Sequence, residues 1–190
     1  MKQLALIAMV AVMSGSVHAQ ADGVQWPVLK PGEVKIVEDL AQVPAITREA
    51  AGNTSADDLS HKVTFTFFKA PQGRDFVVID PCCGPKGNGA SLFEFSESMV
   101  KAVALAVGDP RAGFHAQAHA DSIRVDAGAA ALRARIAFPD CEDGVWGYYY
   151  HFDEADRPVL LSVIDTSCAH LGVRELYHAM NIDLGHWWQR

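Results

Sequence analysis

Cysteine is the residue type with the most evident chemistry in this sequence, because two of its four copies, Cys82 and Cys83, are neighbours. They lie in a turn between the apolar run 76–79 and a segment that begins with Ser91. A thiol at the start of a helix has a lowered pKa and, beside a histidine, can act as a nucleophile. The local signatures of cysteine hydrolases are absent here. A cysteine hydrolase is therefore only the alternative function.

Disulfide bonds are the favoured role of the cysteines, since an even number in an exported chain indicates pairing. A bond between the neighbours Cys82 and Cys83 would strain the peptide that joins them. We therefore expect each of them to pair with one of the two remaining cysteines, Cys141 and Cys168, in either of two arrangements.

Glycines in the same turn, Gly84, Gly87 and Gly89, invite comparison with a phosphate-binding loop, since the N-terminus of a helix attracts anions. Their spacing matches neither G-x-x-x-x-G-K-[ST] nor G-x-G-x-x-G. The glycines therefore indicate a tight turn whose backbone angles only glycine adopts easily.

Histidines form the second group with potential chemistry. His115 and His119 are four residues apart, a spacing that places both on one face of a strand or of a helix. His151 or His170 is the candidate third ligand for a metal, and His115, His119 and His151 are candidate bases for a cysteine nucleophile. No H-E-x-x-H or C-x-x-C motif accompanies them. The sequence therefore predicts no metal site, no cofactor and no catalytic residue, with these histidines as the alternative.

An aromatic strand with acidic flanks is the candidate binding surface. Residues 145–152 alternate as a strand does, so Tyr148 and Tyr150 share one face. Asp153 and Glu154 follow directly in a turn. Because exposed aromatic side chains commonly anchor protein interfaces, we expect these four residues to contact a protein partner.

The first nineteen residues have the pattern of a signal peptide: Lys2 precedes an apolar run, and Val17-His18-Ala19 precedes a cleavage point at Gln20. No later stretch approaches the roughly 20 apolar residues of a membrane-spanning helix. The sequence predicts a periplasmic or secreted protein without membrane insertion.

The net charge of the full sequence is -7 at pH 7. Nucleic acids and anionic membranes select for Lys and Arg, so neither is an expected partner. Opposite charges accelerate association, and a basic exported protein is therefore the expected partner.

The elements that would position these residues indicate an α+β fold. Residues 20–60 are poorly patterned and are expected to be extended or irregular, and residues 61–190 are expected to form a single α+β domain. Strands are predicted at 62–69, 74–80, 145–152 and 158–165, with further strand-like segments between 114 and 138. The main helix is predicted from Ser91, because Glu94 completes a capping box and apolar residues recur at helical spacing as far as Ala106.

A C-terminal helix is predicted over about 167–180. The expected architecture is an antiparallel sheet of about five to six strands, with the main helix packed on one face. The functional hypothesis is an exported, disulfide-stapled binding protein, such as an inhibitor or immunity-type protein for a basic envelope enzyme. The alternative is an exported hydrolase that uses a cysteine nucleophile or a histidine-bound metal.

Overall fold

The computed structural model describes residues 24–52, 63–81, 89–109, 112–126, 130–137, 145–165 and 174–178. Most of these residues form strands, and every strand pair among them is antiparallel. Among the described residues, the helical elements are a short 3-10 helix at Leu40–Gln42 and one α-helix, α1, at Ala45–Gly52. Within this part of the chain, no helix has both the length and the apolar character needed to cross a membrane.

The first sheet has six strands in the order β1-β2-β3-β4-β5, and β8 pairs with β4 outside this path. Its strands are β1 (Val34–Val37), β2 (Val63–Lys69), β3 (Asp75–Pro81), β4 (Ala90–Ser96), β5 (Met99–Val103) and β8 (His119–Ala120).

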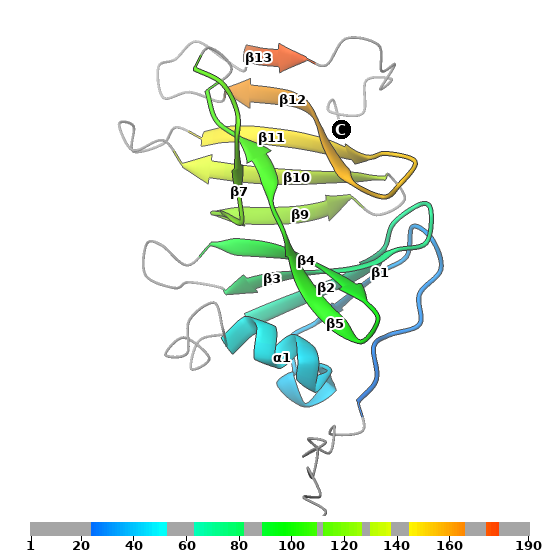
Figure 1. The fold of residues 1–190 in the computed structure, drawn as a ribbon. Coiled ribbons are helices and arrows are strands. Elements are labelled where there is room, and N and C mark those ends of the chain that lie inside the picture. Colours follow the sequence, from blue (N-terminus) through cyan, green and yellow to red (C-terminus); the bar gives the residue numbers. More distant parts are fainter. Residues whose placement is uncertain are drawn as a thin grey trace, which may run out of the picture.

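The second sheet has five strands in the order β13-β12-β11-β10-β9, and a separate two-stranded sheet joins β6 to β7. The strands of the second sheet are β9 (Ser122–Asp126), β10 (Ala131–Ala137), β11 (Val145–Phe152), β12 (Pro158–Asp165) and β13 (Arg174–His178). The two-stranded sheet consists of β6 (Leu105–Val107) and β7 (His115–Gln117). Figure 1 shows β9, the edge strand of the second sheet, beside β3 and β4 of the first.

One apolar core is shared by the two large sheets and β6. Phe68 and Phe76 of the first sheet stack with ring centroids 5.3 Å apart, and Phe152 of the second sheet lies within 5.8 Å of both rings. Aromatic pairs of this kind contribute stability beyond the area that they bury. The two sheets are therefore joined mainly by apolar packing of their facing side chains.

A second apolar core lies on the opposite face of the first sheet. Val43 and Ala51 come from the segment around α1, and they pack with Phe65 and Phe67 of β2. Figure 1 shows α1 beside this sheet, at the end of the molecule away from β12 and β13. Because β2, β3 and β4 have apolar side chains on both faces, the first sheet is covered on both sides.

The main helix predicted from Ser91 is wrong, because the same residues form β4, β5 and β6. Leu92 and Phe93 are adjacent and both buried, one in each core, which requires a strand covered on both faces. Ser96 pairs with Met99, and the two residues between them have positive φ, as a two-residue hairpin turn requires. The apparent helical spacing therefore came from three successive strands, the first two of which are joined by a tight turn.

The predicted C-terminal helix is also wrong, because Arg174–His178 forms strand β13, which pairs with β12. The fold is mostly β, with three antiparallel sheets in place of the expected α+β architecture. The segment 20–60, expected to be extended or irregular, contributes β1 and α1 among its described residues. The strands predicted at 145–152 and 158–165 are confirmed with the same bounds.

Candidate functional site

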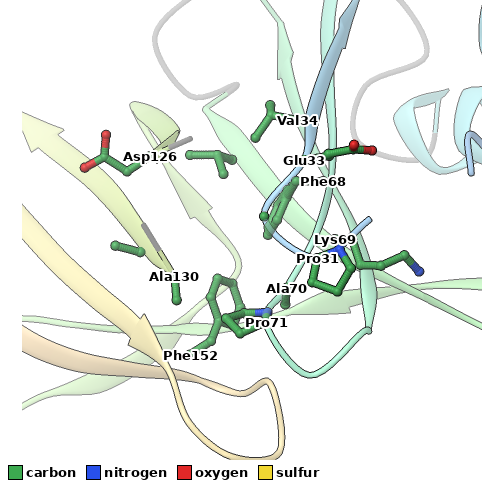
Figure 2. A pocket seen from close by; sticks show the side chains of 13 residues that line it. Pro31, Glu33, Val34, Phe68, Lys69, Ala70, Pro71, Asp126, Ala130 and Phe152 are labelled. Carbon is green, nitrogen blue, oxygen red and sulfur yellow. The ribbon is translucent and has the colours of Figure 1, made fainter. Parts of the chain in front are cut away.

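A cleft opens where the first and second sheets meet, with a volume of about 330 Å³. We call it the seam cleft. Its lining comes from the chain around β1, the end of β2, the β9–β10 region and the end of β11, and consists of Pro31, Gly32, Glu33, Val34, Phe68, Lys69, Ala70, Pro71, Val125, Asp126, Ala130, Ala131 and Phe152. Figure 2 shows the rings of Pro31, Pro71, Phe68 and Phe152 gathered around this space. Residues from four distant parts of the chain therefore form one apolar site.

Two turns build the wall on the side of the first sheet. The Gly32 N–H donates to the Lys69 carbonyl at 2.9 Å, and the Lys69 N–H donates to the Glu33 carbonyl at 3.2 Å. Gly32 has a φ of 81°, which a glycine adopts without strain. In the second turn, the Ala70 N–H donates to the Arg74 carbonyl at 2.9 Å. These bonds hold the backbone of both turns beside Phe68.

Asp156 fastens this wall to the second sheet. Its carboxylate accepts the N–H groups of Gln72 and Arg74, each at 2.9 Å, although Asp156 follows them by more than eighty residues. Asp156 is 1% exposed. Hydrogen bonds to a charged acceptor are stronger than neutral ones, so this contact fixes the β2–β3 turn against the β11–β12 turn. The position of Ala70 and Pro71 in the cleft depends on it.

The charged side chains at the rim have partners of their own. Lys69 Nζ lies 2.8 Å from Asp75 and 3.2 Å from the Gly73 carbonyl, and Glu33 accepts the Lys30 N–H at 2.8 Å. Figure 2 shows the charged ends of Glu33, Lys69 and Asp126 directed away from the cleft. Apolar side chains therefore face the space between the sheets, and no nucleophilic or acidic group of the lining residues points into it.

The apolar surface continues from the seam cleft along β1. Val34 and Ile36 are two residues apart and share the face of the first sheet that looks toward the second. Val34 packs against the shared core, whereas Ile36 is 64% exposed. The cleft is thus the covered end of an apolar strip on β1.

The two tyrosines expected to contact a partner are buried. Tyr148 and Tyr150 are 2% and 0% exposed, and their hydroxyl groups donate to the carbonyls of Gly108 and Ala106 at 3.2 and 2.8 Å. Burial raises the pKa of Tyr148 and of Tyr150 above the ordinary value. The expectation of exposed anchors therefore needs correction: this face of β11 packs against β6, and Tyr149 lies on the other face.

The acidic residues expected to contact a basic partner have mixed roles. Asp153 accepts the N–H groups of Ala155 and Arg157 at 2.9 Å, and it pairs with the Arg157 guanidinium at 2.7 Å. The side-chain hydrogen bond from Arg157 lowers the pKa of Asp153 to about 2. Glu154 is exposed. Of the two predicted residues, Asp153 organises its own turn and Glu154 is presented to the surface.

The three candidate histidines lie on different strands. His115 is exposed on β7, His119 is exposed on β8, and His151 is half-buried on β11. His119 Nδ1 lies 2.7 Å from the Ser91 hydroxyl, a contact typical of a nucleophile and its base. Ser91 is only 3% exposed, within a strand paired on both sides, so substrate cannot reach it. In the described parts of the chain, no group of three His, Cys, Asp or Glu side chains could hold a metal.

Three features of the sequence analysis lie outside the described residues: the four cysteines, the signal-peptide segment 1–19, and the turn glycines Gly84 and Gly87. The disulfides predicted for Cys82 and Cys83 with Cys141 and Cys168 therefore also lie outside the described residues.

No protein-family model, curated protein or solved structure matches this chain. Sequence reasoning missed the seam cleft, because its only local signals are the turns at Lys30-Pro31-Gly32 and Pro71-Gln72-Gly73. Nothing in the sequence indicates that these turns lie beside Ala130 and Phe152.

Proposed function

We propose that the protein is a binding protein that holds a ligand with an apolar body in the seam cleft. The observation that carries this proposal is the lining, in which Phe68 and Phe152 come from different sheets and side chains of proline, valine and alanine complete the walls. Its volume of about 330 Å³ falls at the lower end of the range for small-molecule sites, roughly 300–1,000 Å³. Binding would be driven by removal of apolar surface from water.

The cleft also has the rigidity that a binding site needs. Asp156 anchors the β2–β3 turn, and the Gly32 and Lys69 backbone bonds hold the second turn of the same wall. A preformed site saves the entropy of ordering its walls when a ligand arrives. The ion pair between Lys69 and Asp75 keeps the nearest ammonium group occupied, which favours an uncharged ligand body.

An exported basic protein remains a second proposed partner, supported by the exposed carboxylate of Glu154 and the net charge of -7. Asp153 supports it less, because its charge is paired with Arg157. The seam cleft is the better-defined surface, and it is the one that we propose to test first.

The test uses the neutral fluorescent probe N-phenyl-1-naphthylamine, whose emission rises in apolar surroundings. Ala130 is exposed and lines the cleft, so Ala130→Phe fills the site without entering a core. Ala116 is exposed on β7 and is not part of the lining, so Ala116→Phe is the matched control. We expect saturable binding of one probe per chain, weakened by about tenfold or more in Ala130→Phe and unchanged in Ala116→Phe, where tenfold corresponds to about 1.4 kcal/mol.

Two outcomes would overturn this proposal. One is the absence of saturable probe binding to the folded wild-type protein. The other is an equal loss of binding in both variants, which would show that the probe adheres to general apolar surface. Circular dichroism spectra of both variants confirm that the sheets have formed.

A further inference from the structure

A second hollow lies on the other face of the second sheet and has the opposite character. Its volume is about 210 Å³, and its lining residues are Arg124, Arg133, Arg135, Val145, Gly147 and Tyr149. We call it the arginine site. It shares no lining residue with the seam cleft. Three guanidinium groups thus gather on one face of a protein whose net charge is -7.

Strand register brings the three arginines together. Arg133 of β10 pairs directly with Arg124 of β9, and Arg135 follows two residues later on the same face. Like charges directly opposite one another in an antiparallel pair destabilise a sheet. Folding alone therefore gives no reason for this arrangement, and an anion between the arginines would relieve the repulsion.

Among the described residues, none of the three arginines forms an ion pair with a carboxylate. The charge of Arg124 does act on Asp80 of β3: burial raises the pKa of Asp80, and the Arg124 charge opposes that rise. One partly buried carboxyl group cannot neutralise three guanidinium groups. By contrast, Arg74 and Arg157 elsewhere on the surface each pair with a carboxylate.

Tyr149 and Gly147 form the wall beside the arginines. A Cβ atom at Gly147 would come within 3.2 Å of Tyr149 Cε2, so the glycine lets the ring lie against β11. The Arg133 guanidinium carbon lies 5.0 Å from the centre of that ring. Stacking on an aromatic face restrains an arginine side chain while leaving its N–H donors free to bind a ligand.

We propose that the arginine site binds a phosphate group, either as the free ion or as a monoester. A phosphate monoester carries a charge of about -1.5 to -2 and three acceptor oxygens, whereas a carboxylate has two oxygens and a single charge. The rigid fork of arginine matches the oxygens of a phosphate with paired hydrogen bonds. The hollow of about 210 Å³ has room for the phosphate group, and Tyr149 in its wall would lie beside the remainder of a monoester.

Isothermal titration calorimetry of the full chain tests this with inorganic phosphate, phenyl phosphate and acetate. We expect one phosphate per chain, with acetate much weaker. Stronger binding of phenyl phosphate than of inorganic phosphate would identify a monoester as the ligand, and the reverse would identify the free ion. Arg135→Gln should weaken phosphate binding by about tenfold or more, since a hydrogen bond to a charged group is lost. Arg74→Gln, which removes an exposed arginine that is not part of the lining, should not weaken it.

A stability measurement separates a binding site from a surface without function. Arg135→Gln should raise the melting temperature of the ligand-free protein, because it removes one of three mutually repelling charges. The same change should abolish the rise in melting temperature that phosphate produces in the wild type. Absence of saturable phosphate binding, or equal weakening by Arg135→Gln and Arg74→Gln, would overturn the proposal. Neither result would bear on the seam cleft.

Discussion

The contact between Asp156 and the β2–β3 turn offers the most direct test of how the two sheets are held together. Asp156 is 1% exposed, has a φ of 54°, and accepts two backbone N–H groups at 2.9 Å. Asn tolerates this backbone conformation and has nearly the same shape, but its amide nitrogen cannot accept a hydrogen bond. Asp156→Asn therefore removes one acceptor and the negative charge while leaving the backbone unstrained.

The expected cost follows from the hydrogen bonds. A bond to a charged group contributes about 1.5–3 kcal/mol, and a neutral bond about 1 kcal/mol. The charged carboxylate of Asp156 accepts two hydrogen bonds, whereas the amide of Asn can accept only one neutral bond. We therefore expect Asp156→Asn to lower the free energy of unfolding by about 2–5 kcal/mol. For a chain of this size, this corresponds to a fall in melting temperature of about 4 °C or more.

Denaturant unfolding followed by circular dichroism measures the change. Glu154→Gln is the control, because it removes an exposed carboxylate from the same turn and should change stability by less than about 0.5 kcal/mol. If the Asp156→Asn protein is as stable as the wild type, Asp156 does not clamp the two turns and the account of the cleft wall fails. We also expect this variant to bind the apolar probe more weakly, because Ala70 and Pro71 are less well fixed.

Two further predictions concern turns. The pKa of Asp153 is lowered to about 2 by its bonds with Arg157, so its contribution to stability is complete above about pH 4 and is lost as the pH falls toward 2. The difference in unfolding free energy between the wild type and Asp153→Asn should shrink over that range, as measured by denaturation at a series of pH values. At the β4–β5 turn, Ser98 has a φ of 65°, so Ser98→Gly should raise the free energy of unfolding by about 1 kcal/mol.

Each of these turn predictions has a clear contrary result. A pH-independent difference for Asp153→Asn would mean that the carboxylate gains nothing from Arg157 in the folded state. A loss of about 1 kcal/mol in Ser98→Gly is the effect that glycine has inside a helix, and it would favour the discarded helix over the β4–β5 hairpin.

The β11–β12 hairpin shows where sequence reasoning succeeds. Residues 145–152 alternate between buried and less buried positions and are rich in aromatic side chains, and 158–165 is rich in β-branched ones. Such segments favour strands whatever surrounds them. The short turn at Asp153–Arg157 makes them antiparallel neighbours, as the register confirms.

The β4–β5 hairpin shows where it fails. Leu92, Phe95 and Met99 have helical spacing, and Ser91 with Glu94 imitates a helix cap. A strand buried on both faces shows no alternation of apolar and polar residues, so its sequence pattern does not indicate a strand. The core contributed by α1 and the core shared with the second sheet cover β4 from opposite sides, and neither is visible in residues 90–96.

In the candidate sites too, the local sequence predicts some features, whereas others depend on contacts between distant residues. Alternation along β11 placed Tyr148 and Tyr150 on one face, but only their hydrogen bonds to residues forty or more positions away show that this face is buried against β6. The sequence also shows that Arg133 and Arg135 point to one side of a strand, whereas their meeting with Arg124 depends on the pairing of β9 with β10.

By itself, the sequence determined the acidic charge, the positions of several turns and the strands whose side chains alternate. Only the tertiary structure decided which face of each strand is covered, that the turn at Gly32 lies beside Phe152, and that Asp156 reaches Gln72. The physical reason is that alternation and turn formation depend on neighbouring residues, whereas a cleft or a charge cluster depends on contacts between residues far apart in the chain.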